Sequence, residues 1–351
     1  MKNAIFLLIY LILSCSSLFA QQRSFRIVTV GFYNFENLFD TLNDPLTFDD
    51  DRTPDGKDHW TEANYKDKLQ NLAHVIADIG SETTGQPPVV LGAAEIENRK
   101  VLEDLVNEPE LAHYNYGIVH YDSPDRRGID VALLYRKSIF KVLNSSVHEL
   151  VLYAYDDASK RAYTRDQLLV TGLLDNEKIH FIINHWPSRS GGEALSQPRR
   201  EAAATLNRKI VDSLRLADPY SKIITMGDLN DDPTNASVAS ILQAKGDVAE
   251  IENFDLYNPM LAMYKSGAGT LAYRDSWNLF DQIIMTGNLL SKDYASYRFY
   301  KAGIFNKEYL NTKAGQYKGY PFRSYANGMY TGGYSDHYPV FIYLIKEVLK
   351  R

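Results

Sequence analysis

Cysteine, basic excess and long hydrophobic runs are all scarce in this 351-residue sequence. Its one cysteine, Cys15, lies in the N-terminal segment. If that segment is removed after export, the remaining chain has no disulfide, no thiolate nucleophile and no cysteine ligand for zinc. His-x-x-x-His pairs, serine elbows, P-loops and dinucleotide-binding glycine patterns are missing as well. These absences exclude cysteine chemistry and disfavour zinc hydrolases, serine hydrolases and nucleotide-binding folds.

The charge balance is acidic rather than basic. The sequence has 38 Lys and Arg against 44 Asp and Glu, a formal net charge of −6. A strongly basic nucleic-acid-binding module is therefore not indicated, because phosphate neutralisation needs a local excess of cations. A nuclease is still compatible with this balance, since an enzyme can meet phosphate through a divalent ion. We expect weak affinity for bare duplex.

The N-terminus has the pattern of an export signal. Lys2 precedes the short apolar run Ile5–Leu13, which is far below the roughly 20 residues that span a bilayer. Cleavage after Ala20 would release a soluble chain that begins at Gln21. Cleavage before Cys15 would instead give an outer-membrane lipoprotein. We expect residues 1–20 to be a signal peptide and the product to be periplasmic or extracellular, with the lipoprotein as the alternative.

Short β-rich runs that end in polar residues recur along the rest of the chain. Several are almost continuously apolar, which is typical of strands covered on both faces, as in stacked sheets flanked by helices. The runs are Arg26–Phe32, Val89–Ala94, Val131–Tyr135, Leu168–Leu173, Ile179–Ile183, Ile223–Met226, Phe280–Met285 and Val340–Leu344.

Helical patterns lie between these runs. In Tyr65–Ile79 apolar residues recur at three- and four-residue steps, and Gly80 ends the pattern. Further helices are predicted at Lys100–Asn107, Arg199–Leu216 and Ser237–Ala244. The interleaving predicts a single α/β domain over residues 23–351. The least regular segments, Asp40–Trp60 and Tyr297–Gly333, are interpreted as surface loops.

Polar residues at the ends of the apolar runs are the most informative feature. Strand ends meet at one edge of a stacked-sheet protein, so side chains that are distant in sequence can converge there. Taken singly, each has a simpler interpretation as a turn, a helix cap or a buried histidine. The residues are Asn34 and Glu36, Glu95 and Glu97, Asn184 and His185, Asp228 and Asn230–Asp232, Asp281, and Asp336 with His337.

Taken together, these residues predict a metal site. Two carboxylates about 4 Å apart repel each other by roughly 4 kcal/mol at an effective dielectric constant near 20, so a shared cleft needs a cation. Oxygen ligands without cysteine favour Mg²⁺, with Mn²⁺ or Ca²⁺ as alternatives. Histidines beside such an ion suggest phosphoryl chemistry, in which the metal neutralises the phosphate and a histidine places a proton.

The order of the motifs resembles the endonuclease/exonuclease/phosphatase superfamily, which includes deoxyribonuclease I. The similarity rests on "FYNFENLFD", "AAEIEN", "NHWPSR", "GDLND", "FDQII" and "SDHYPV" and extends from about residue 25 to residue 345. "NFENLFD", "EIEN" and "RRGIDVALLYR" look closest to secreted bacterial nuclease-like members. The resemblance implies a deoxyribonuclease I-like, four-layer sandwich of two mixed β-sheets flanked by helices.

The resemblance also implies a role for each matched position. Asn34, Glu95 and Asp336 would hold the metal. His337, oriented by Asp281, would hydrogen-bond the scissile phosphate.

The remaining matches concern the water and the phosphate. Asp228 would orient or deprotonate the attacking water, Asn230 would bind a phosphate oxygen, and His185 matches a second active-site histidine. The implied reaction is in-line attack of water on phosphorus. The phosphate-contacting tyrosine of repair-type relatives has no secure counterpart; Tyr121, Arg127 and Asp130 are nearby candidates, and Arg127 is favoured as a substrate contact. Glu36 makes the first motif more acidic than the common pattern of the superfamily. It is interpreted either as an acidic group that supports the metal ligands or as a turn residue.

Three functions stay open at this point. The leading hypothesis is an exported nuclease or phosphodiesterase. Its groove candidates are Arg126, Arg127, Arg189, Arg199 and Arg200. The alternative for Arg199 and Arg200 is that they are solvated helix charges. The second is a phosphatase or a sphingomyelinase- or phospholipase C-like enzyme on phospholipid or inositol phosphate, and the third is an inactive binding module. The tyrosine-rich Tyr297–Tyr334 could stack bases, meet a membrane or bind sugar. We expect a monomer without an obligate protein partner, acting on nucleic acid or another phosphate ester.

Overall fold

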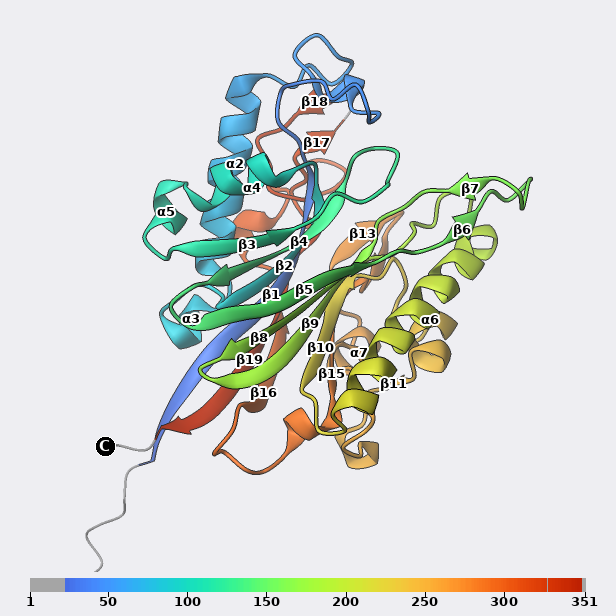
Figure 1. Ribbon diagram of the computed structural model, residues 1–351. Helices are drawn as coiled ribbons and strands as arrows, with labels where there is room; N and C mark the ends of the chain where they lie inside the picture. The colour runs from blue at the N-terminus through green and yellow to red at the C-terminus, as the bar shows by residue number, and fades with distance from the viewer. Residues whose placement is uncertain (1–22, 327, 349–351) are drawn as a thin grey trace, which may run out of the picture.

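The computed structural model describes residues 23–326 and 328–348, so the expected signal peptide lies outside the described residues. Two β-sheets form the centre of the molecule (Figure 1). The first has the order β16-β19-β1-β2-β4-β3 and the second the order β11-β12-β15-β10-β9-β8-β5. Each is mixed: β1 and β2 are parallel in the first and β9 and β10 in the second, whereas their outer neighbours are antiparallel.

The strands of the first sheet are β1 (Ser24–Leu38), β2 (Val90–Ile96), β3 (Tyr116–His120), β4 (Asp130–Arg136), β16 (Arg298–Ile304) and β19 (Val340–Val348). Those of the second are β5 (Phe140–His148), β8 (Gln167–Leu174), β9 (Glu177–His185), β10 (Ile223–Asp228), β11 (Ala244–Lys245), β12 (Leu256–Tyr257) and β15 (Asp281–Thr286). Short hairpins are β6 (Leu152–Tyr153) with β7 (Arg161–Ala162), β13 (Leu271–Tyr273) with β14 (Ser276–Asn278), and β17 (Tyr325–Ala326) with β18 (Met329–Tyr330).

Three apolar cores explain why the runs are hydrophobic on both faces. One core lies between the sheets and contains Phe32 of β1, Phe181 of β9 and Met226 of β10. The second packs the outer face of the first sheet against α2, and the third packs the outer face of the second sheet against α6. Figure 1 shows these helices on opposite sides of the sheet pair. The predicted four-layer sandwich is therefore confirmed.

The helices are α2 (Glu62–Asp78), α3 (Ser81–Thr84), α4 (Arg99–Val106), α5 (Pro109–Ala112), α6 (Glu193–Ala217) and α7 (Met260–Lys265), with 3₁₀ turns at Asp50–Arg52, Val248–Glu250, Gly287–Leu290 and Glu308–Leu310. Thr61 caps α2 by accepting a hydrogen bond from the Asn64 N–H. Helix α6 starts well before the predicted Arg199, because Pro198 is accommodated inside it. The helix predicted at Ser237–Ala244 is a π-helical turn, Ser237–Ile241.

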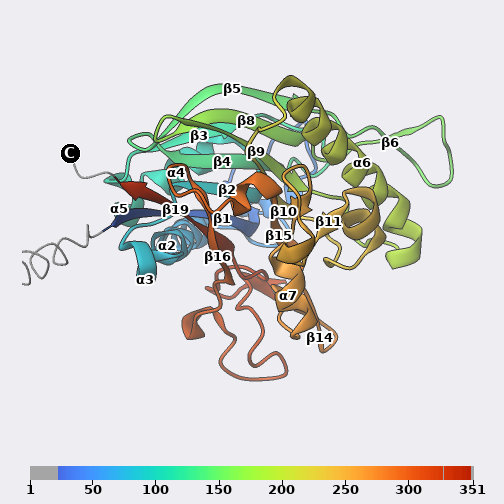
Figure 2. The same ribbon diagram turned by 90° about the horizontal axis from the view of Figure 1, so that it is seen from below.

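All eight predicted runs are strands, but the interpretation of Tyr297–Gly333 as a surface loop is wrong at its start. Strand β16 pairs with β19 at the edge of the first sheet, and Tyr297 is only 1% exposed. Between these two strands the chain forms a long loop, part of which projects near β14 (Figure 2), and this loop includes the short β17–β18 hairpin beside α2 (Figure 1). Among the helices that the structure describes, none is long and apolar enough to cross a membrane.

Candidate active site

A row of polar side chains crosses the end of the second sheet. Asp228 of β10 lies opposite His185 of β9 on one side and Asp281 of β15 on the other. Successive side chains of a strand alternate between faces, so Asp228 shares the inner face with Met226, which belongs to the core between the sheets. The row therefore continues the inward-facing apolar pattern at the point where it becomes polar.

The first sheet contributes Asn34 and Glu95 from its parallel pair. Asn34 follows the core residue Phe32 by two positions, and its Nδ2 donates to Asp228 Oδ2 at 3.1 Å, which joins the two sheets. Glu95 lies at an irregularity between Ala94 and Ile96 and has a φ of +61°. Bulges of this kind redirect side chains beside active sites, and a non-glycine residue in this region costs of order 1–3 kcal/mol. The Asn37 N–H holds the Glu95 carboxylate at 3.0 Å.

The segment before β19 supplies Asp336 and His337. Ser335 anchors it, because its hydroxyl donates to the Asn34 carbonyl at 2.7 Å and accepts from the His337 N–H at 3.1 Å. His337 Nδ1 lies 2.7 Å from Asp281 Oδ2. That carboxylate keeps the proton on Nδ1 and directs Nε2 into the site. Ser335 was not among the predicted site residues. Its position directly before Asp336 is the signal that could have identified it.

Direct contacts join the predicted residues into one site. His185 Nε2 is 3.7 Å from Glu95 Oε1 and 3.6 Å from Asp228 Oδ2. His337 Nε2 is 3.9 Å from both Asp228 Oδ2 and Asp336 Oδ1. Residues from both sheets thus meet at one end of the sandwich.

Asn230 has a more structural environment than predicted. Its φ is +50°, its N–H donates to Asp228 Oδ1 at 2.9 Å, and its Nδ2 donates to the Trp186 carbonyl at 3.0 Å. The side-chain nitrogen is thus already engaged in the structure. Phosphate binding by Asn230 stays a prediction, and its observed contacts orient Asp228.

The two histidines are driven in opposite directions by their surroundings. Burial alone would lower the pKa of His337, but the charges of Asp281 and Asp228 outweigh it and raise that pKa well above its ordinary value. Burial lowers the pKa of His185 far below its ordinary value, and the cations Arg165 and Arg127 lower it further. Burial also raises the pKa of Asp228 to about 7, with His337 opposing the shift. The site therefore pairs a cationic with a neutral imidazole.

Arg127 lies beside this centre, where its charge acts on His185. Its N–H donates to Asp125 Oδ1 at 2.9 Å, and its side chain is about half exposed. The buried Arg165 donates one hydrogen bond to Asp125 Oδ2 at 3.0 Å and another to the Trp186 carbonyl at 2.7 Å. Substrate contact by Arg127 stays a prediction, and Arg165 is a cation that sequence reasoning missed.

One of the other arginine predictions is wrong. Arg200 is neither a groove residue nor a solvated helix charge, because it is fully buried and its Nε pairs with Asp231 Oδ1 at 2.6 Å. Arg189 lines a neighbouring cleft, but its guanidinium is also paired with Asp231 and Asp232, at 3.3 Å each. Both arginines brace the turn that follows β10.

Glu36 has a supporting role that explains its departure from the common pattern. Its carboxylate accepts from the backbone N–H of Ser324 at 2.5 Å and from the Ser324 hydroxyl at 2.8 Å. Arg323, next in the same loop, reaches both Glu36 at 3.4 Å and Asp336 at 3.0 Å. The buried Lys68 of α2 donates to Ser324 at 2.7 Å, and burial lowers the pKa of this lysine to about 8. The network ties the long loop to the predicted metal ligand Asp336.

The donor set fits a divalent metal. Two buried carboxylates, Asp228 and Asp281, lie beside His337 with polar atoms of all three within 4.8 Å of one another. Asp281 Oδ1 is buried without a hydrogen-bond partner among the described residues. Asn34, Glu95 and Asp336 add amide and carboxylate oxygens around this cluster, and oxygens are the ligands of hard cations. The dense negative charge is what such an ion would neutralise.

Solved structures share this architecture at low sequence identity. A D. rerio TDP2 complexed with single-strand DNA product is 14% identical, with a TM-score of 0.53 over 91% of this chain and 98% of that one. The human Nocturnin catalytic domain with bound sulfate is 13% identical, with a TM-score of 0.52 over 93% and 98%. A mannosyl-6-phosphatase of Bacteroides thetaiotaomicron is 15% identical, with a TM-score of 0.51 over 92% and 100%. These likenesses define a deoxyribonuclease I-like fold.

Comparison with family models is more specific. A search of the curated proteins finds no match. The model of the Endonuclease/Exonuclease/phosphatase family matches residues 29–346. The chain therefore belongs to that family, as its motifs predicted, and its class of chemistry is the hydrolysis of phosphate esters.

Proposed function

We propose that this protein is an exported, Mg²⁺-dependent phosphodiesterase that hydrolyses nucleic acid. The observation that carries the proposal is the convergence of Asn34, Glu95, His185, Asp228, Asp281, Asp336 and His337 at one end of the two sheets. Export rests on the N-terminal pattern alone.

The residues divide into groups with distinct tasks. Asn34, Glu95 and Asp336 would hold the metal, which when bound neutralises the phosphate and polarises its P–O bonds. His337 Nε2 points away from its Asp281 partner and is placed to donate its proton to a non-bridging phosphate oxygen. The charge of this imidazolium is stabilised before substrate arrives, so no reorganisation is needed during the reaction.

Asp228 is placed to manage the attacking water. Its Oδ1 is held by the Asn230 N–H and its Oδ2 by Asn34, so the carboxylate has a fixed orientation. A pKa near 7 suits a group that accepts a proton at neutral pH. The water oxygen forms a bond to phosphorus, the bond to the leaving oxygen breaks, and the water proton passes to Asp228. Neutral His185 lies within 3.6 Å of the same carboxylate and supports its position.

The test compares four substrates with the purified protein in Mg²⁺ or EDTA: bis-p-nitrophenyl phosphate, p-nitrophenyl phosphate, DNA and sphingomyelin. His337→Ala should abolish turnover, because it removes the phosphate donor. His113→Ala is the matched control, since His113 is exposed and lies outside the site. We expect metal-dependent cleavage of the diester and of DNA, which is lost only in the first variant.

Other outcomes would contradict the proposal. Turnover confined to the monoester or to sphingomyelin would assign the site to a phosphatase or a phospholipase C-like enzyme. Full activity in EDTA would remove the metal from the reaction. Inactivity on all four substrates with retained ligand binding would indicate a binding module.

A further inference from the structure

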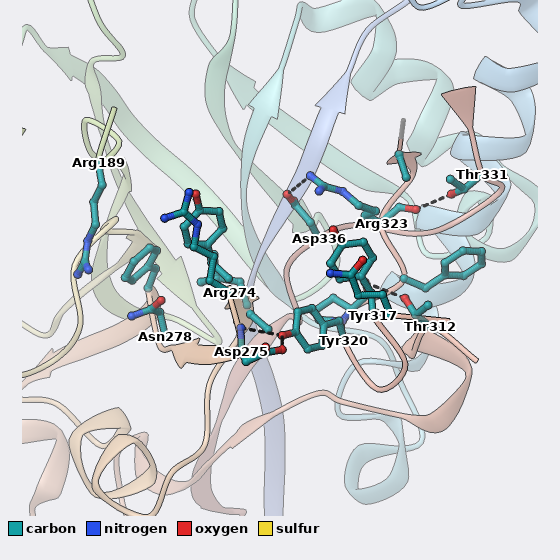
Figure 3. Close-up of a pocket in the computed structure, with 18 of the residues that line it drawn as sticks. Arg189, Arg274, Asp275, Asn278, Thr312, Tyr317, Tyr320, Arg323, Thr331 and Asp336 are labelled. Atoms are coloured by element: carbon teal, nitrogen blue, oxygen red, sulfur yellow. Dashed lines mark hydrogen bonds and ion pairs between the residues drawn. The ribbon is translucent and has the colours of Figure 1, made fainter. Parts of the chain in front are cut away.

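A large cleft adjoins the catalytic residues and has no role in the chemistry described above. Its volume is about 1140 Å³, and Asp336 and Arg323 lie at one edge of it. The hairpin β13–β14 forms one wall, and the loop between β16 and β19 forms the other (Figure 3). The cleft therefore leads directly to the predicted metal ligand and to the position of the scissile bond.

The two walls are fixed to each other. Arg274 and Asp275 form the tip of the hairpin, and both have positive φ values, +49° and +63°. The Tyr320 hydroxyl donates to Asp275 Oδ1 at 2.5 Å and accepts from the Asp275 N–H at 2.9 Å (Figure 3). Positive φ at both residues of a two-residue hairpin loop is the geometry of a type I′ turn, so the hairpin has a defined shape of its own and Tyr320 links it to the opposite wall. The shape of the cleft is thus set before any ligand binds.

Aromatic side chains cover both walls. Tyr273 of the hairpin is 63% exposed and Tyr317 of the loop is 53% exposed, and both line the cleft with Tyr320 and Phe322. Neither Tyr273 nor Tyr317 belongs to a hydrophobic core within the described part of the chain. Exposed tyrosines lose little conformational entropy on binding and offer flat faces for a ligand.

One cation in the cleft is available to an anionic ligand. Arg189 and Arg323 are held by carboxylates. Arg274 has no ion-pair partner among residues 23–326 and 328–348, and its guanidinium lies 5.1 Å from the Tyr273 ring centroid. A cation stacked on an exposed aromatic ring combines a phosphate contact with a surface for a base.

We infer that this cleft binds single-stranded nucleic acid, with bases stacked on Tyr273 and Tyr317 and a backbone phosphate at Arg274. The inference rests on the proposed function, because the strand must carry its scissile phosphate to Asp336 and His337. A duplex covers its base faces by stacking and pairing, so the aromatic walls can be used only by an unpaired strand. The enzyme therefore selects single strands through this cleft.

The test measures kcat/KM for a labelled single-stranded oligonucleotide, for its duplex, and for bis-p-nitrophenyl phosphate. We expect the wild type to cleave the single strand at least about tenfold faster than the duplex. Since stacking of one base on an aromatic residue is worth about 5- to 150-fold in binding, Tyr317→Ala and Tyr273→Ala should each lower kcat/KM for the single strand by that factor relative to the small diester. Tyr317→Phe, which keeps the ring, should retain the wild-type ratio.

Two further variants sharpen the result. Arg274→Ala should reduce the slope of log affinity against log salt for the single strand by about 0.7, the value for one phosphate contact. Tyr300→Ala is the matched control, because this tyrosine is 56% exposed on β16 and does not line the cleft. It should leave all three activities at the wild-type level.

The outcomes separate the two proposals. Absence of metal-dependent turnover of bis-p-nitrophenyl phosphate would overturn the proposed function, and this inference with it. If the small diester is cleaved, equal rates on single strand and duplex would overturn the inference alone. So would Tyr273→Ala and Tyr317→Ala variants that stay within twofold of wild type, or a Tyr317→Phe variant as impaired as Tyr317→Ala. Faster turnover of a hexose 6-phosphate that is lost in the same variants would assign the cleft to a sugar, which also contradicts the inference.

Discussion

Replacing Asp281 with asparagine isolates the electrostatic part of the catalytic site. Asp281 is fully buried, and its Oδ2 lies 2.7 Å from His337 Nδ1. Asparagine keeps the shape and one oxygen acceptor but removes the negative charge. The charge of Asp281 is the largest influence that raises the pKa of His337 against the effect of burial. Without it, burial dominates and His337 becomes neutral at a lower pH.

The size of the effect follows from the hydrogen bond that is weakened. A buried hydrogen bond between charged partners contributes about 1.5–3 kcal/mol. If the phosphate is stabilised by the cationic form of His337, about 1.5–3 kcal/mol of transition-state stabilisation is lost. That corresponds to a decrease in kcat of roughly 10- to 150-fold. KM should change little, because the ground-state contacts are retained.

The assay is the pH dependence of kcat for bis-p-nitrophenyl phosphate in Mg²⁺. A raised pKa keeps His337 protonated to higher pH, so the variant should lose activity at a lower pH than the wild type does. Asp166→Asn is the control, since Asp166 is also buried but lies outside the site. A kcat within threefold of wild type with an unchanged basic limb would refute the assigned role of Asp281. Thermal unfolding of both variants tests whether the fold is intact.

Two further predictions concern stability. His180 is buried on β9 away from the catalytic residues, and burial lowers its pKa to about 4, so folding favours its neutral form and the unfolded state takes up the proton first. The resulting stability is present above pH 6.5 and is lost as the pH falls toward 4. Between pH 7 and 4.5 the free energy of unfolding, measured in urea, should therefore fall by about 2 kcal/mol less for His180→Gln than for the wild type. Equal decreases in the two proteins would contradict this account. Gly227→Ala should destabilise the fold by about 1–3 kcal/mol, because the new Cβ would lie 2.3 Å from the Asn184 carbonyl oxygen. An unfolding free energy equal to that of the wild type would show that β9 and β10 can move apart at no cost.

Much of the fold was readable from local patterns. Every apolar run that was predicted to be a strand is one, because burial on both faces demands continuous apolar residues. The short strands of two or three residues were missed, and so were three longer ones, β3, β5 and β16, two of which show why. β5 lies at the edge of its sheet with a single buried residue, Phe140, and β16 also lies at an edge and is only partly buried, so neither has a strong apolar pattern. Edge strands gain their structure from a neighbour rather than from their own composition.

The candidate site divides in the same way. The sequence alone determined which residue types stand at the strand ends. Because every second side chain of a strand shares a face, Asn34 lies on the same face as Phe32, and Asp228 on the same face as Met226. Only the tertiary structure decided that these two side chains, 194 positions apart, share a hydrogen bond. It also decided the environment of each charged group.

The buried charges make this clearest. His185 and His337 are chemically identical, yet their pKa values shift in opposite directions, because one lies near Arg165 and the other contacts Asp281. Arg200 was expected at the surface and is buried against Asp231. The burial of a charged group and its ion-pair partners depend on contacts between distant segments. The residues next to it in the sequence do not reveal them. The sequence determined the chemical groups, and the packing of the two sheets determined their protonation and their geometry.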